Sequence, residues 1–129
     1  MDVGQIQQVL MNLLNNAADA IEERVVQENA GLDFKREITI RAVYEPERER
    51  IITTVSDNGT GMSDETRSKI FTLHFTTKKG GHGLGLSNCK KIIQAHHGDL
   101  LVDSTPGEGT EFRVILPRFQ PEKPKSDKK

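Results

Sequence analysis

The sequence contains little of several residue types, and each shortage narrows what the chain can be. Its 129 residues include one cysteine, Cys89, no tryptophan and 5% aromatic residues. A single cysteine cannot form an internal disulfide, which excludes the disulfide-rich secreted scaffolds and favours a reducing, cytoplasmic compartment. No apolar run reaches the about 20 residues that a membrane helix needs, and the N-terminus lacks a signal-peptide layout. We therefore expect no direct membrane insertion by this chain, although a longer, membrane-anchored parent protein is compatible with it.

An excess of positive charge is also missing. Lys and Arg number 18 against 19 Asp and Glu, which gives a formal net charge of -1. Proteins that bind along nucleic acid normally carry an excess of Lys and Arg, so we expect no nucleic-acid partner. Apolar residues make up 34% and charged residues 29%, which is polar for a globular protein but well short of a disordered composition.

Hydrophobic periodicity predicts the order of the secondary-structure elements. Apolar residues recur at helical spacing over residues 3–21, and the helical pattern lapses from residue 28, which predicts one long helix. Segments in which apolar and polar residues alternate predict four strands that pair as two hairpins. Two further helices lie between these hairpins, and a capping residue or a glycine-rich loop precedes each of them. The later elements are strands at 38–44 and 51–56, a short helix capped by Ser63 and ending near 71, a loop to 85, a helix at 86–97, and strands at 100–104 and 110–116.

This order predicts a layered α/β sandwich, in which helices cover one face of a mixed, largely antiparallel sheet. We assign residues 1–118 to a single domain. Residues 119–129 are rich in Pro, Lys, Asp and Ser, and we expect them to form a disordered polar tail.

The first helix carries a polar face that packing does not require. Gln8, Asn12, Asn16 and Asp19 fall at positions that share one side of a helix. Asn is a poor residue for a helix interior, and exposed helix positions usually hold Lys, Glu, Gln or Arg. Amide oxygens suit a hard cation such as Mg²⁺ that also shares substrate phosphates. On this segment alone, a solvated helix face remains the alternative.

Two glycine-containing loops follow in the sequence. Residues 57–62, Asp-Asn-Gly-Thr-Gly-Met, come directly after a predicted strand, where glycines let backbone approach a ligand closely, although a plain turn is the alternative. Residues 80–87 open a helix, and glycines there place backbone N–H groups toward an anion such as phosphate. The P-loop pattern is absent, and Leu86 stands where the third glycine of a Rossmann fingerprint would fall.

Taken in this order, these segments resemble the ATP-binding domain of sensor histidine kinases, in the superfamily shared with gyrase, the ninety-kilodalton heat-shock chaperone and the mismatch-repair ATPase. The resemblance runs from about residue 2 to residue 117 and implies the α+β, two-layer sandwich of the Bergerat ATP-binding fold. The N box corresponds to residues 12–17, the first glycine box to 57–62, the F box to 71–75, the second glycine box to 81–85, and the last glycine box to Gly109-Thr110 with the strand that follows.

The resemblance implies ATP and Mg²⁺ as cofactors and assigns roles to individual residues. Asn16 would ligate Mg²⁺, and Asn12 would support the metal or the phosphates. The carboxylate of Asp57 would accept a hydrogen bond from the adenine amino group, with Thr110 supporting the same corner. The remaining nucleotide-binding residues would shape the adenine pocket, fold the lid over the triphosphate, or neutralise phosphate charge: Gly59, Gly61, Gly81, Gly83, Leu84, Gly85 and the lid lysine Lys78 or Lys79, for which a solvated side chain is the alternative.

Position 12 separates kinases from hydrolases in this superfamily, because the hydrolases carry there a Glu that activates water. Asn12 cannot act as a base near neutral pH, so the resemblance implies phosphoryl transfer to a protein. None of the four histidines has the setting of the family's phosphoacceptor, and we interpret His74, His82, His96 and His97 as ordinary surface or loop residues. The expected partners are the dimerisation and phosphoacceptor domain of a parent kinase and, downstream, a response regulator.

Some features depart from the family pattern. The family usually has a strand or two before the first helix, the F box reads Phe-Thr-Leu-His-Phe, and Asp19 replaces a frequent Lys. The short lid resembles the nitrogen-regulatory and sporulation kinase branch. Two alternatives stay open: a stand-alone protein-serine kinase or anti-sigma switch on the same fold, and a module that senses nucleotide without transferring phosphate.

Overall fold

The structure is a computed structural model, and it describes residues 2–28, 34–72 and 85–118. Every element expected within these ranges is present, with ends that differ from the predicted ones by about one to three residues, a normal uncertainty for element boundaries. The elements in chain order are α1 (Val3–Glu28), β1 (Ile38–Glu45), β2 (Arg50–Asp57), α2 (Asp64–Lys69), α3 (Gly85–Ala95), β3 (Asp99–Thr105) and β4 (Gly109–Pro117).

Two predictions fall on other parts of the chain. The loop expected before α3 lies almost entirely at residues 73–84, and the expected tail occupies residues 119–129, so both lie outside the described residues. The predicted cap of the short helix is present, because the backbone N–H of Thr66 donates to the Oγ of Ser63 at 3.2 Å. Among the described helices, none combines the length and apolarity needed to cross a membrane.

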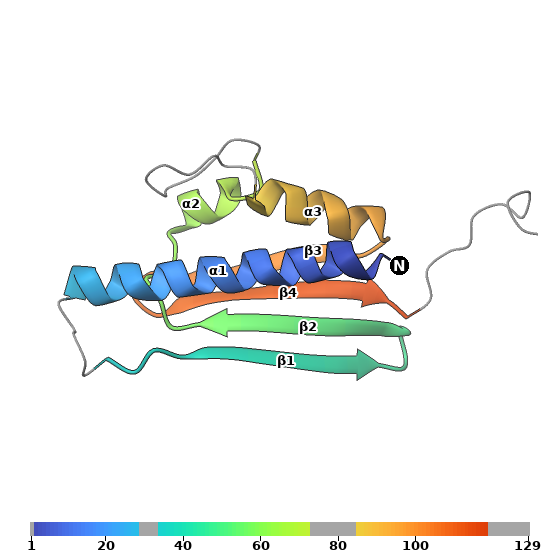
Figure 1. The fold of residues 1–129 in the computed structure, drawn as a ribbon, viewed down its shortest axis with the longest axis horizontal. Helices are drawn as coiled ribbons and strands as arrows, with labels where there is room; N and C mark the ends of the chain where they lie inside the picture. Colours follow the sequence, from blue (N-terminus) through green and yellow to red (C-terminus); the bar gives the residue numbers. More distant parts are fainter. Residues whose placement is uncertain (1, 29–33, 73–84, 119–129) are drawn as a thin grey trace, which may run out of the picture.

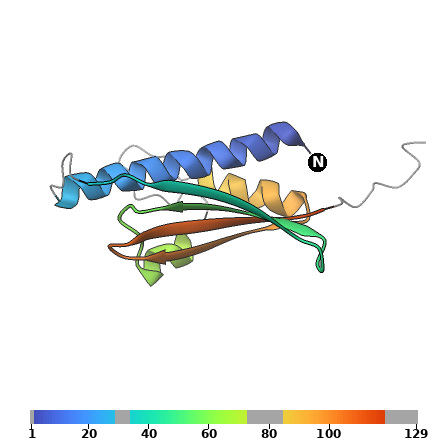
Figure 2. The same ribbon diagram turned by 90° about the horizontal axis from the view of Figure 1, so that it is seen from below.

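The four strands form one sheet in the order β1-β2-β4-β3. All three pairings between the described strands are antiparallel, so the parallel pairing implied by a mixed sheet has no counterpart among them. The long helices α1 and α3 lie on one face of this sheet, with α1 running along the strands, and the short α2 lies beside β3 (Figures 1 and 2). The predicted two-layer sandwich is confirmed.

The core lies between the sheet and the helices, and alternation on β4 shows how it forms. Every second residue of β4 is buried, beginning with Thr110, while the residues between are half-buried on the opposite face. An apolar stripe on α1 and two apolar residues of α3 pack against the buried face of the sheet and complete the core. The buried side chains of these three elements are Thr110, Phe112, Val114 and Leu116 of β4, Val9, Leu13, Ala17 and Ile21 of α1, and Ser87, Cys89 and Ile93 of α3.

The end of α3 is joined to the start of α1 by a buried histidine. His96 is 7% exposed, so its interpretation as an ordinary surface or loop residue is wrong. Its Nδ1 lies 2.7 Å from the carbonyl oxygen of Ile92, and its Nε2 accepts from the backbone N–H of Asp2 at 3.0 Å. Because a carbonyl can only accept, Nδ1 carries the proton and the ring is neutral. Both ring nitrogens are therefore used for structure.

Candidate functional site

Asp57 is the last residue of β2, opposite Thr110 on β4. Its Oδ1 accepts from the backbone N–H of Gly59 at 2.8 Å, a local turn that follows from an Asp placed two residues before a glycine. Burial raises the pKa of the Asp57 carboxyl, and hydrogen bonds from the backbone N–H groups of Gly59 and Thr110 partly offset that effect. The carboxylate is thus partly desolvated, and the N–H of Gly59 orients it.

The two glycines of residues 57–62, here called the Asp57 loop, are required by close packing. A Cβ on Gly59 would lie 2.6 Å from the carbonyl carbon and Cβ of Ala20 on α1. Gly61 has a φ of 72°, and a Cβ there would lie 2.0 Å from the carbonyl oxygen of Thr105. The backbone N–H of Thr60 donates to the Ala20 carbonyl at 3.2 Å. The loop is therefore pressed between α1 and the end of β3, and larger residues do not fit there.

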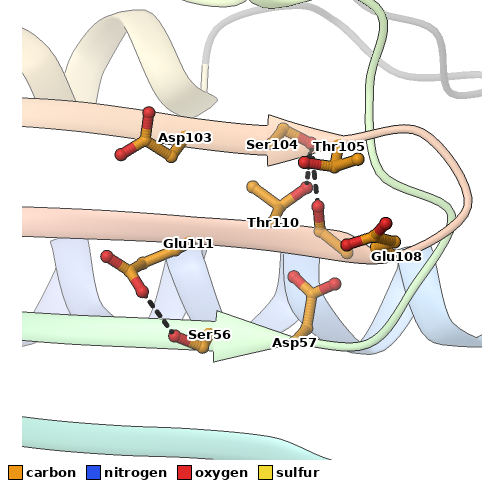
Figure 3. A pocket seen from close by; sticks show the side chains of 9 residues that line it. Ser56, Asp57, Asp103, Ser104, Thr105, Glu108, Thr110 and Glu111 are labelled. Atoms are coloured by element: carbon orange, nitrogen blue, oxygen red, sulfur yellow. Dashed lines mark hydrogen bonds between the residues drawn. The ribbon is translucent and has the colours of Figure 1, made fainter.

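Ser104 on β3 connects this loop to Thr110, a role that the sequence did not indicate. Its Oγ accepts from the backbone N–H of Met62 at 2.7 Å and lies 2.8 Å from the Oγ1 of Thr110 and 3.0 Å from the carbonyl oxygen of Gly109 (Figure 3). One signal was available: Ser104 continues the inward-facing register of β3, where a polar residue needs a partner.

Arg24 and Asn58 also fix the Asp57 loop, and both were missed. The Arg24 Nη1 donates to the carbonyl oxygens of Asn58 at 2.9 Å and Gly59 at 3.4 Å. The Asn58 side chain turns the other way: its Oδ1 accepts from the backbone N–H of Glu37 at 3.0 Å, and its Nδ2 donates to the carbonyl of Lys35 at 2.7 Å. Nothing in the local sequence indicates these contacts, because they join segments far apart in the chain.

The polar face of α1 extends from a contact with α3 at one end to a contact with the Asp57 loop at the other. Asn12 is half-buried, and its Nδ2 donates to the Sγ of Cys89 on α3 at 3.5 Å. Ala20, eight residues later, contacts Gly59. Successive residues four apart lie about 6 Å from one another along a helix, so half-buried Asn16 lies between these two contacts. Asn12, Asn16 and Asp57 therefore border one region on the helix side of the sheet.

A surface hollow lies where β2 and β3 end and β4 begins, and Asp57 and Thr110 form part of its lining (Figure 3). Ser56, Asp103 and Glu111, which also line it, point away from the helices by the alternation of their strands. The hollow is rich in carboxylates, and Arg113 pairs with two of them. Such a surface repels a triphosphate, so phosphate groups are expected on the helix side. The carboxylates that line the hollow are Asp57, Asp103, Glu108 and Glu111.

Of the remaining predicted site residues, Gly85 is the one that the structure describes. Gly85 is the first residue of α3 and is exposed, and a Cβ added there would meet no atom within 4 Å. The described residues contain no group of three His, Cys, Asp or Glu side chains able to hold a metal. A cation here would therefore depend on amide oxygens and on the ligand's own phosphates. Four predicted residues lie outside the described residues: Lys78, Gly81, Gly83 and Leu84.

Comparison with known proteins gives consistent matches. The sequence profile of the family described as histidine kinase-, DNA gyrase B- and HSP90-like ATPase matches residues 1–120. The signal transduction histidine-protein kinase AtoS of Escherichia coli (strain K12) is 39% identical over 112 residues, which cover 87% of this chain and 16% of that protein. The chain spans 14% to 28% of the length of the curated relatives that it matches.

Two solved structures share the fold. The catalytic domain of histidine kinase ThkA, in a nucleotide-free form, superposes with a TM-score of 0.69 at 32% identity and covers 91% of this chain and 69% of that chain. Full-length ShkA in complex with AMPPNP superposes with a TM-score of 0.72 at 26% identity and covers 88% of this chain and 21% of that chain.

Proposed function

Because the chain belongs to the histidine kinase-, DNA gyrase B- and HSP90-like ATPase family, we propose that it binds Mg-ATP and donates the γ-phosphoryl group to a histidine on a separate dimerisation domain. The observation that carries this proposal is the desolvated Asp57 carboxylate, oriented by backbone N–H groups at one end of the amide-lined face of α1. The complex of the similar protein ShkA with AMPPNP, an ATP analogue, supports the same ligand class.

Adenine recognition is assigned to the Asp57 corner. An ionised carboxylate accepts hydrogen bonds only, which matches the exocyclic amino group of adenine and not the carbonyl of guanine. Thr110 is buried, and its hydroxyl is held by Ser104, so it supports this corner without rearrangement. Gly59 and Gly61 allow the loop to lie close to α1 and β3, which shapes the wall of the pocket.

The triphosphate is assigned to the space between α1 and the start of α3. Asn16 would hold Mg²⁺ through its amide oxygen, and Asn12, one turn away, would support the metal or the phosphates. The N–H groups at the start of α3 suit anionic phosphate. Bound Mg²⁺ would neutralise charge on the β- and γ-phosphates. The lid residues proposed to cover the triphosphate are Lys78, Gly81, Gly83, Leu84 and Gly85.

Transfer rather than hydrolysis follows from the residue at position 12. An amide does not accept a proton from water near neutral pH, so Asn12 does not supply a general base at this position. Phosphoryl transfer needs mainly positioning and charge neutralisation, which this site supplies to an incoming imidazole. His96 is not the acceptor, because both of its ring nitrogens are engaged in the domain. A response regulator would receive the phosphoryl group downstream.

The first experiment is titration calorimetry with Mg-ADP and Mg-AMPPNP. We expect wild type to bind both, Asp57→Asn to bind neither measurably, and Asn16→Ala to lose the Mg²⁺-dependent part of the affinity. Asn15→Ala is the matched control, because Asn15 is the adjacent amide and is exposed. A folded wild-type chain that bound no adenine nucleotide would overturn the proposal.

A second experiment distinguishes histidine transfer from the alternatives. The chain is mixed with labelled ATP and a dimerisation domain that carries the phosphoacceptor histidine. Label that is lost in acid and kept in alkali indicates phosphohistidine. Acid-stable label on a protein partner would favour a serine kinase, and binding without any transfer would favour a nucleotide-sensing module.

A further inference from the structure

Arg24 is a half-buried arginine on α1 that lies outside the N box, the glycine boxes and the F box. Its side chain is 19% exposed, and its Nε pairs with Glu28 at 2.9 Å. Its guanidinium also lies 5.1 Å from the ring centroid of Phe34. These contacts fix the plane of the guanidinium and direct Nη1 toward the Asp57 loop, where it donates to the carbonyl of Asn58 at 2.9 Å.

One peptide unit connects Arg24 to Asp57. The carbonyl of Asn58 and the N–H of Gly59 belong to the same planar peptide and point in opposite directions. Arg24 donates to that carbonyl, and that N–H donates to the Oδ1 of Asp57 at 2.8 Å. The Arg24 guanidinium on the carbonyl side restricts rotation of this peptide. It also polarises the peptide, so that the N–H becomes a stronger hydrogen-bond donor.

A second set of contacts holds the opposite side of the same loop. The Arg24 Nη1 lies 3.5 Å from the carbonyl oxygen of Glu108, and the N–H of Gly107 donates to the carbonyl of Thr60 at 2.7 Å. The turn before β4 and the Asp57 loop are thus tied together beside Arg24. The other carboxylates that line the hollow with Asp57 belong to Asp103, Glu108 and Glu111, and Arg113 pairs with Asp103 and Glu111.

We propose that Arg24 is a positioning residue for adenine recognition, acting on the Asp57 carboxylate through the peptide between Asn58 and Gly59. The adenine part of this inference rests on the proposed function. The effect on Asp57 itself does not, since it concerns the protein without nucleotide. Arg24 does not contact the base in this scheme, and its substitution changes how well Asp57 is held.

The test compares Arg24→Met and Arg24→Lys with wild type, and Arg36→Met is the matched control. Arg36 also pairs with a glutamate of α1, Glu22, but its side chain is 42% exposed and it makes no contact with the Asp57 loop carbonyls in the described structure. Two quantities are measured: the titration of the Asp57 carboxyl carbon by NMR without nucleotide, and the affinities for Mg-ADP and Mg-IDP, which differ at the amino group.

We expect Arg24→Met to move the Asp57 titration to higher pH and to weaken Mg-ADP binding about tenfold, the effect of losing one charged hydrogen bond. Mg-IDP binding, measured by competition, stays unchanged, so the ADP-over-IDP preference falls by the same factor. Arg24→Lys keeps the charge without the planar fork and recovers part of both effects. A purely structural role would lower the melting temperature and affect both nucleotides equally, which would overturn the inference.

The outcomes separate this inference from the proposed function. If wild type binds no Mg-ADP but Asp57 still titrates higher in Arg24→Met, the proposed function fails and the positioning of Asp57 stands. If wild type binds Mg-ADP and both Arg24 variants keep the wild-type titration and preference, the positioning role is wrong and the proposed function stands. If Arg24→Met does not fold, the same two quantities are compared between Arg24→Lys and wild type.

Discussion

The side-chain amide of Asn12 on α1 donates to the Sγ of Cys89 on α3, with Nδ2 and Sγ 3.5 Å apart. The sulfur in turn lies 4.0 Å from the carbonyl oxygen of Val9, the acceptor available to its S–H. Because the amide is planar, a nitrogen directed at Cys89 leaves the Asn12 oxygen facing away from it. A fully buried thiol therefore orients a side chain that borders the proposed phosphate region.

Cys89→Val tests this contact, since valine keeps an apolar side chain, larger by about one methyl group, and removes the acceptor. We expect the affinity for Mg-AMPPNP to fall several-fold, because the unsatisfied Asn12 amide becomes free to rotate, at a cost of about 1 kcal/mol. Calorimetry measures the change. Cys89→Ser, which keeps an acceptor, is the control, and equal affinities for all three proteins would show that Cys89 does not orient Asn12.

The raised pKa of Asp57 predicts an acid limit for nucleotide binding. The carboxylate must be ionised to accept from the adenine amino group, so affinity falls as pH decreases through the folded pKa, which lies above the ordinary 3.8. The same shift means that Asp57 favours the folded state less as pH rises from 3.8 through that value. Adenosine, which has no titrating phosphates, is the probe for the binding profile. A profile without an acid limb above the ordinary aspartate range would contradict the assignment.

Gly61 and Gly107 form a matched pair for backbone substitution. Both have positive φ, 72° and 79°, but an added Cβ clashes with the Thr105 carbonyl only at Gly61. We expect Gly107→Ala to cost about 1 kcal/mol of unfolding free energy for the left-handed conformation alone. Gly61→Ala should cost about 3 kcal/mol or more, because the loop must also shift. Urea denaturation measures both, and similar losses would show that the loop yields easily at Gly61.

Lys90 and Asp99 predict a pH-dependent contribution to stability. The Lys90 Nζ donates to Asp99 at 2.9 Å, and this hydrogen bond is the main cause that lowers the pKa of the Asp99 carboxyl. A lowered folded pKa stabilises the fold above the ordinary aspartate pKa and loses that effect as pH falls through the folded value. We expect Lys90→Met to melt lower than wild type at pH 7, with the difference narrowing in acid.

Two controls separate this pair from other contacts of Lys90, which also donates to the Leu100 carbonyl at 2.8 Å. Asp99→Asn removes the titrating group, so in that background the effect of Lys90→Met should no longer depend on pH. Lys91→Met changes the adjacent, exposed lysine and should leave the melting temperature unchanged. A pH-independent difference in the wild-type background would exclude the ion pair as its source.

Local patterns were sufficient for the elements, because alternation and helical spacing are set by which face of each element is buried. The Ser63 cap and both hairpins follow from such short-range signals. The strand order was not accessible in this way, since the pairing of β2 with β4 joins distant segments. Likewise, the sequence indicated Asp57 as a ligand-binding residue. The contacts of Arg24 and Ser104 with the Asp57 loop could not be predicted from it, because they join elements that lie far apart in the chain.

The position of β4 has a consequence for synthesis on the ribosome. Of the four described strands, β4 is made last and lies between β2 and β3, so this sheet remains divided until residues 109–117 have left the exit tunnel. Until then β2 keeps an open hydrogen-bonding edge on the side that β4 later occupies. We therefore expect the four-stranded sheet to be completed only after β4 has emerged, and slowing translation before residue 109 should prolong the exposure of that edge to chaperones.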